Sequence, residues 1–177
     1  MDLVDRLNNT GFLGKEFLTW LWYKSDSGEG LIDIGDGRGA AEVWFTSRIV
    51  LSGAGQGADR VSVKTEEPSA SIEARTALRE GKKVDQASLR IVRDQREWTA
   101  TIKGEALAIG GAKIPAVLTK DEDDRQRERF ALVDQLDAMV ASLYAAFVAL
   151  RIEPAAWASE VTAMRAWLDL PASADVG

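Results

Sequence analysis

The chain has 177 residues, 46% hydrophobic and 28% charged, a balance typical of a globular protein with a buried core rather than of a disordered chain. It contains no cysteine and no histidine, which excludes disulfides, thiolate zinc sites, cysteine nucleophiles and the commonest general base, so we expect no enzyme, no metal site and no cofactor. The net charge of −6 argues against indiscriminate binding to polyanions, although it leaves room for a local basic patch.

The N-terminal sequence MDLVDRLNNTGFLG has acids where a signal peptide needs bases, and no run approaches the roughly 18–20 apolar residues of a membrane span. We therefore expect a cytoplasmic protein without membrane contact. The next segment predicts a helix over about 14–25. Its Trp20 and Trp22 could stack on bases, but large aromatics on such a helix favour core positions.

Short alternating runs predict strands between about 30 and 64, separated by glycine-rich segments at Gly35–Gly39 and Ser52–Asp59. The second segment resembles a dinucleotide-binding loop, but the strand-like RVSVK follows it where a phosphate cradle needs a helix. Both segments are therefore interpreted as hairpin loops.

A helix is predicted over about 70–81, with Ser69 or Ser71 as its cap and Gly81 after its end. Strands follow over about 84–118, in the order SLRIV, EWTATI, ALAI and KIPAV, with DQRE and the Gly110-Gly111 pair as turns. The alternation of side chains predicts that Arg90, Arg96 and Lys103 lie on an exposed face.

Two helices are predicted at the end of the chain, over about 122–151 and about 154–169. Apolar residues recur at helical spacing in the first, namely Phe130, Val133, Leu136, Val140, Leu143, Phe147 and Leu150. These residues could form a dimer or partner interface together with the tryptophan-bearing last helix, or they could cover the sheet. The acids Asp121–Asp124 suit a helix N-terminus, and a carboxylate-metal nuclease is the less favoured alternative.

The order of helix, strands, helix, strands and two helices predicts a single α+β domain over residues 1–177, with an antiparallel β-meander sheet packed against helices. Within it, the run 75–96 carries seven bases and three acids, a net charge of +4 in an acidic chain. The bases are Arg75, Arg79, Lys82, Lys83, Arg90, Arg93 and Arg96. This run could be a solvated face or a surface that contacts a polyanion.

The segments FLGKEFLTWLWYKSD and SIEARTALREGKKVDQASLRIVRDQREWTATIKGEALAIGGAKIPAV, followed by the acid-rich start of a long helix, resemble the C-terminal half of the RdgC recombination-associated proteins. The similarity spans about Gly11 to Arg151. It implies a bacterial, nucleoid-associated protein that binds double-stranded DNA with little sequence preference, as a homodimer that closes a ring around the duplex.

The N-terminal half of that family has no counterpart here, so a closed ring, partial coverage of a duplex and binding to a partner protein all stay open. The resemblance assigns Lys64, Lys82 and Lys83 to the DNA contacts. The local charge adds Arg75, Arg79, Arg90, Arg93 and Arg96. We therefore predict a non-catalytic protein that binds duplex DNA through phosphate contacts, with an interaction or oligomerisation module as the alternative.

Overall fold

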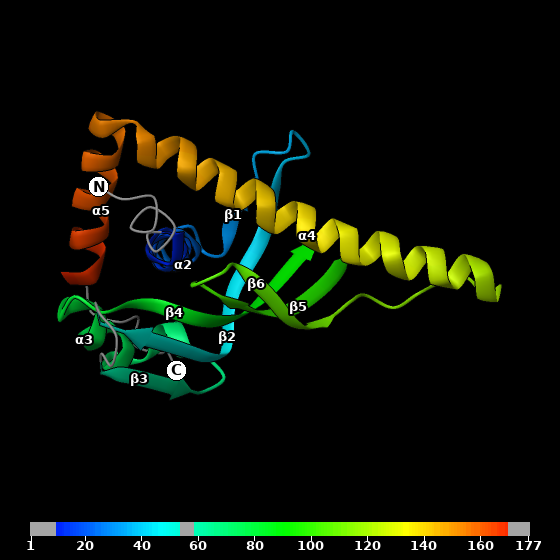
Figure 1. Ribbon diagram of the computed structural model, residues 1–177, viewed down its shortest axis with the longest axis horizontal. Coiled ribbons are helices and arrows are strands. Elements are labelled where there is room, and N and C mark those ends of the chain that lie inside the picture. Colours follow the sequence, from blue (N-terminus) through cyan, green and yellow to red (C-terminus); the bar gives the residue numbers. More distant parts are fainter. Residues whose placement is uncertain (1–9, 54–58, 170–177) are drawn as a thin grey trace.

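The computed structural model describes residues 10–53 and 59–169, which form an antiparallel sheet with helices packed on one side (Figure 1). The helices are α2 (Thr10–Ser27), α3 (Ile72–Arg79), α4 (Glu122–Ile152) and α5 (Pro154–Asp169), with a short 3-10 helix η1 (Pro68–Ala70) before α3. The strands are β1 (Leu31–Asp33), β2 (Ala40–Ser52), β3 (Arg60–Lys64), β4 (Lys83–Arg93), β5 (Arg96–Lys103) and β6 (Ala108–Lys113). The predicted α+β class and the two C-terminal helices are confirmed.

The long strand β2 connects most of the sheet. The strand order is β1-β2-β4-β5-β6, and β3 also pairs with β2. Strand β1 pairs with the first residues of β2 and β3 with the last ones, so both lie along the edge of β2 that faces away from β4. The predicted hairpin loop at Gly35–Gly39 joins β1 to β2. The ends of the predicted loop Ser52–Asp59 also join paired strands, and residues 54–58 lie outside the described part.

The turn between β4 and β5 was predicted correctly, whereas the turn at Gly110-Gly111 was not. Asp94 and Gln95 have φ of 51° and 61°, the left-handed pair that matches the twist of a tight hairpin. Gly110 and Gly111 lie inside β6, where Gly111 takes a φ of 60° at an irregular register opposite β5. The predicted strand KIPAV contributes only Lys113, because a proline two residues later has no N–H for the ladder.

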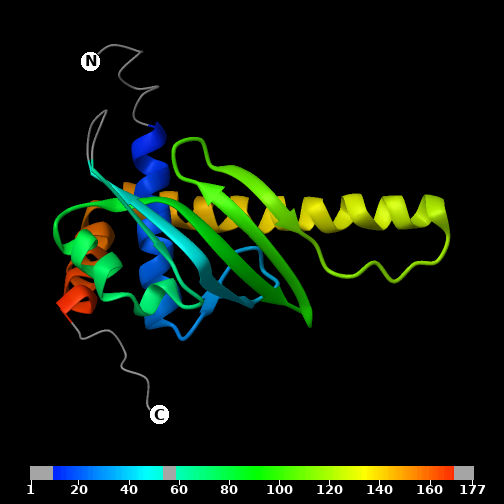
Figure 2. The same ribbon diagram turned by 90° about the horizontal axis from the view of Figure 1, so that it is seen from below.

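Helix α2 lies across one face of the sheet and carries much of the core. The prediction that Trp20 and Trp22 are core residues is confirmed, since their exposed fractions are 4% and 0%. Phe147 of α4 lies 5.7 Å from Phe17, and Trp167 of α5 lies 5.6 Å from Trp22, measured between ring centroids. Aromatic contacts therefore hold α4 and α5 against α2 on the same side of the sheet (Figures 1 and 2).

The N-terminal part of α4 extends beyond the sheet, as both views show (Figures 1 and 2). Asp121 caps the helix, because its carboxylate accepts hydrogen bonds from the backbone N–H groups of Asp123 at 3.1 Å and Asp124 at 3.3 Å. The pattern of buried residues differs from the predicted one. Phe130 and Val133 are exposed, and Leu132 and Met139 are buried together with the predicted Leu136, Val140, Leu143 and Phe147.

Within the described residues, α4 is the one helix that is long and apolar enough, by length and composition, to cross a membrane. Its 18-residue apolar window has a mean hydropathy of 1.4 and is 33% buried. The buried side chains pack on the sheet and α2, and the outward side carries exposed alanines at positions 138, 141, 145 and 149. Small outward residues and core packing therefore account for the hydropathy of a helix that covers a sheet.

Candidate nucleic-acid interface

The predicted basic run 75–96 does not form one surface. Arg75 and Arg79 lie on α3, Lys82 and Lys83 lie at the start of β4, and Arg90 to Arg96 lie around its far end. Strand β4 has 11 residues, which corresponds to about 33 Å at ~3.3 Å per residue. The two ends of the run therefore lie near opposite ends of β4.

Arg75 was predicted to contact DNA, but the structure places it inside the protein. Its side chain is 4% exposed, and its Nη2 donates to the Asp26 carboxylate at 2.5 Å. The guanidinium also lies 5.0 Å from the ring centroid of Trp167. Trp167 Nε1 donates to the same Asp26 oxygen, so this network joins α2, α3 and α5. Arg75 serves the packing of three helices and is not available to DNA.

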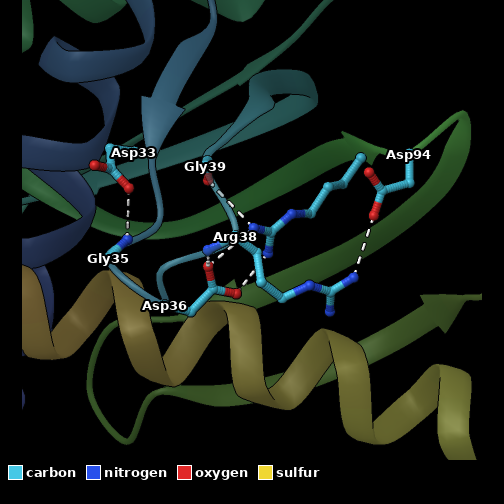
Figure 3. Close-up of polar contacts among 7 residues, drawn as sticks. Asp33, Gly35, Asp36, Arg38, Gly39 and Asp94 are labelled. Carbon is cyan, nitrogen blue, oxygen red and sulfur yellow. Dashed lines mark hydrogen bonds and ion pairs between the residues drawn. The ribbon is translucent and has the colours of Figure 1, made fainter.

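Arg93 is the second correction. It is 5% exposed, and its two terminal nitrogens donate to the two Asp36 carboxylate oxygens at 2.6 and 2.9 Å. Figure 3 shows Asp36, Arg38 and Gly39 on the loop between β1 and β2, with Asp94 beside Arg38. The Arg93 hydrogen bonds and the backbone N–H of Arg38 hold the pKa of Asp36 well below its usual range. Arg93 therefore anchors the β1–β2 loop.

Three further predicted cations have partners within the protein. Arg79 donates to the backbone carbonyl of Leu168 at the end of α5. Lys82 pairs with Glu80 at 2.9 Å, and Glu80 raises the pKa of the Lys82 ammonium. Lys83 pairs with Glu16 of α2 at 3.1 Å. Much of the positive charge at the helix-to-strand corner is thus compensated.

The face of the sheet opposite α2 and α4 gathers cations from five strands. Buried residues on β4 and β5 alternate with partly or fully exposed ones, so the second set points away from the covering helices. Register partners share a face, which places Arg48 beside Lys64 and Lys113 beside Thr99. The cations of this face, called the open sheet face below, are Arg48, Lys64, Arg90, Lys103 and Lys113.

Positive charge outweighs negative charge on the open sheet face. Its carboxylates are Asp33, Glu42 and Glu97, so the five cations leave a net charge of +2. Arg90 pairs with Glu97 at 2.9 Å in an exposed contact. Among the described residues, no carboxylate forms an ion pair with Lys64, Lys103 or Lys113. In Figure 2, seen from the sheet side, the strands pass in front of α2 and α4.

The sequence-based prediction therefore located part of this surface. It contained Lys64 and Arg90 and placed Lys103 on an exposed face, but it missed Arg48 and Lys113. Arg48 follows an irregularity at Ser47, whose φ of 53° interrupts the alternation of β2. Lys113 was assigned to a separate strand. Arg96 lies at the other side of the hairpin end, in the cavity described below.

Trp44 lies within the open sheet face, since it is the register partner of Arg90. Its indole is partly exposed and packs on the backbone of Gly30, where a side chain would collide with the ring. Glycine is needed at position 30 for this contact, and its φ of 80° adds a second reason. The indole therefore has a fixed position on a basic surface.

The acids Asp121–Asp124 have a structural role at the start of α4, as the cap of that helix. In the parts of the chain that the structure describes, no group of three or more acidic side chains is placed to hold a metal ion. Most of the apolar residues of α4 that could have formed a dimer or partner interface are buried against the rest of the protein. Phe130 and Val133 are the exposed ones among them.

No protein-family model matches this chain, and a search of curated proteins gives no match. The likeness to the RdgC proteins and the homodimer that it implies therefore stay predictions. What the fold itself defines is an α+β protein with one helix-covered and one largely open sheet face.

We expect the stability lost in Asp36→Asn to depend on pH. The lowered pKa keeps the folded carboxylate ionised where the unfolded chain binds a proton. This contribution to folding is complete above the ordinary carboxyl pKa of 3.8 and declines as the pH falls below it. In denaturant titrations between pH 5.5 and 2.5, the difference in the free energy of unfolding between wild type and variant should become smaller as the pH falls. A constant gap would contradict the role assigned to Asp36.

Proposed function

We propose that this protein binds double-stranded DNA without sequence preference, through phosphate contacts made by the open sheet face. The observation that supports this proposal best is a net charge of +2 on an exposed surface of a chain whose overall charge is −6. A local field of this sign attracts phosphates even though the whole molecule does not. A cytoplasmic, nucleoid-associated role in recombination belongs to the same proposal.

The chemistry of the surface suits phosphates better than base edges. Lys64, Lys103 and Lys113 present flexible ammonium groups, which neutralise charge without fixing a sequence. The hydroxyls of Ser88 and Thr101 lie between the cations, 3.3 Å from one another, and can donate to phosphate oxygens. Binding through such groups depends strongly on salt.

The test is a titration of duplexes of several lengths and sequences at several salt concentrations. We expect measurable binding at low salt, similar affinities for unrelated sequences, and a linear fall of log affinity with log salt. Each phosphate contact should contribute about 0.9 to that slope. Absence of binding at low salt with micromolar protein would refute the proposal. Incubation of the complex with Mg²⁺ should leave the DNA intact, since we propose no nuclease activity.

A second candidate, single-stranded nucleic acid, is favoured by Trp44. A partly exposed indole beside a cation is the combination that stacks on unpaired bases in sheet-based binding sites. The same titration with single strands separates the two. If the protein binds single strands more tightly than duplexes, and Trp44→Ala abolishes this preference, single-stranded nucleic acid is the ligand instead of duplex DNA.

A further inference from the structure

The structure holds a cavity that the open sheet face does not include. It lies between the β1–β2 loop, the β4–β5 turn and α4, with a volume of about 350 Å³. Figure 3 shows the loop and Asp94 above α4 in this region. Cavities of roughly 300–1,000 Å³ are the usual size of small-molecule sites. This cavity lies at the lower end of that range.

Three arginines line the cavity, and they differ in how many of their N–H donors already form hydrogen bonds within the protein. Arg93 is fixed by Asp36 and by the carbonyl of Gly39, so this pair forms a neutral, rigid part of the wall. Arg38 forms an ion pair with Asp94 at 3.2 Å, with both side chains at least 60% exposed. Exposed pairs of this kind contribute little free energy, so Arg38 can exchange Asp94 for another anion.

Arg96 and Gln135 also line the cavity, and their polar groups are unused. Over residues 10–53 and 59–169, neither the Arg96 guanidinium nor the Gln135 amide forms a hydrogen bond or ion pair. The charge of Arg96 acts only at a distance on Glu128, as the weakest of the effects that lower the pKa of that carboxyl. A guanidinium has five N–H donors, and an amide has two N–H donors and one acceptor oxygen, so donors outnumber acceptors on this wall.

The charges of the cavity also favour an anion. Three arginines and two aspartates line it, a net of +1, and Asp36 is already occupied by Arg93. Part of the lining is apolar, because Trp98 and Met139, which are 2% and 4% exposed, lie beside Arg96 on β5 and beside Gln135 on α4. The cavity therefore combines an anion-binding rim with an apolar floor.

We propose that this cavity binds a small phosphate monoester with an apolar body, with Arg96 and Arg38 contacting the phosphate and Gln135 hydrogen bonding to it. Guanidinium groups bind phosphate with paired hydrogen bonds, which suits the free fork of Arg96. Trp98, Ala138 and Met139 contact the apolar body. This site is separate from the open sheet face, and it does not depend on DNA binding.

The test uses phenyl phosphate and inorganic phosphate as probes, with isothermal titration calorimetry on the full chain. We expect phenyl phosphate to bind at least about tenfold more tightly than inorganic phosphate, because only the former contacts the apolar floor. We expect Arg96→Gln combined with Gln135→Ala to weaken phenyl phosphate binding by about tenfold or more. Arg125→Gln, an exposed arginine outside the cavity, is the matched control and should bind normally.

Several outcomes would overturn the proposal. They are absence of phenyl phosphate binding at millimolar concentration, equal affinity for both probes, and unchanged affinity in the Arg96 and Gln135 double variant. Circular dichroism and thermal unfolding show whether that variant is folded. If it is not, the single Gln135→Ala variant serves instead, since this side chain is half-buried and forms no hydrogen bond within the described residues. A variant with glutamate at Lys103 and Lys113 should keep its affinity for phenyl phosphate, which distinguishes this site from the proposed DNA surface.

Discussion

Replacing Lys103 and Lys113 together by glutamate is expected to weaken duplex DNA binding by roughly tenfold or more. Both lysines are exposed on the open sheet face and have no ion-pair partner in the described part of the chain. The double replacement changes the charge of this face from +2 to −2, so it turns attraction for phosphates into repulsion. The log–log salt slope should fall by about 1.8, because two phosphate contacts are lost. Fluorescence anisotropy at several salt concentrations measures both effects.

Arg125→Glu with Arg127→Glu is the matched control for that experiment. It alters the net charge by the same amount, but at the exposed start of α4, where Asp121–Asp124 already make the local field unfavourable to DNA. We expect at most a small loss of affinity. Equal losses in the two folded variants would show that net charge alone governs binding, and the open sheet face would then have no special role.

Lys82→Glu with Lys83→Glu tests the surface that sequence reasoning preferred. These lysines already pair with Glu80 and Glu16, so their charge is less available to phosphates. We expect a smaller loss of affinity than in the Lys103 and Lys113 variant. A larger loss of affinity would show that Lys82 and Lys83, at the corner between α3 and β4, are the main DNA contacts.

Arg75→Met is expected to lower the free energy of unfolding by about 2–4 kcal/mol. The replacement fills a similar volume but leaves Asp26 with an uncompensated charge beside Trp167. It also removes the hydrogen bond from Arg75 to the carbonyl of Trp167 and the cation–π contact with its ring. Urea denaturation followed by circular dichroism measures the effect. DNA affinity of the folded fraction should be unchanged, because Arg75 is buried.

Two further variants show whether the charge of Asp26 is the cause. Arg79→Met removes a neighbouring arginine that is exposed, and it should cost less than about 1 kcal/mol. Asp26→Asn together with Arg75→Met should be more stable than Arg75→Met alone, since no partly buried charge is then left without its partner. If Asp26→Asn does not raise the free energy of unfolding of the Arg75→Met variant, the loss of stability arises from lost packing and not from the uncompensated carboxylate.

Most of the secondary structure was predictable because its signals are local. Ser71 accepts a hydrogen bond from the backbone of Ala74, and Gly81 takes a φ of 87° after α3, as their positions around an apolar stripe indicated. The breaks at Asp121 and Pro154 marked the two last helices to within one residue. The prediction at Gly110-Gly111 was wrong because a glycine pair is equally compatible with a turn and with an irregular strand.

The candidate site was only partly predictable, because the position of a charged residue in the sequence does not show which carboxylate it contacts in the fold. Arg75 and Arg93 belong to the most basic stretch of the chain, yet Asp26 and Asp36 lie 49 and 57 residues away from them and neutralise them inside the fold. Lys64 and Lys103 are far apart in the sequence, and only the pairing of β3 with β2, of β2 with β4 and of β4 with β5 brings them to one face.

The sequence by itself determined the helices, the strand order along the chain and the aromatic core of α2, since apolar period, caps and breakers act over a few residues. The tertiary structure decided which cations are free. An arginine or lysine is less available to a ligand where a buried carboxylate of the same chain neutralises it, and for Arg75 and Arg93 those carboxylates come from distant segments that packing places nearby. For the same reason, the pairing of strands alone determined that Arg48 and Lys113 share a surface with Lys64, Arg90 and Lys103.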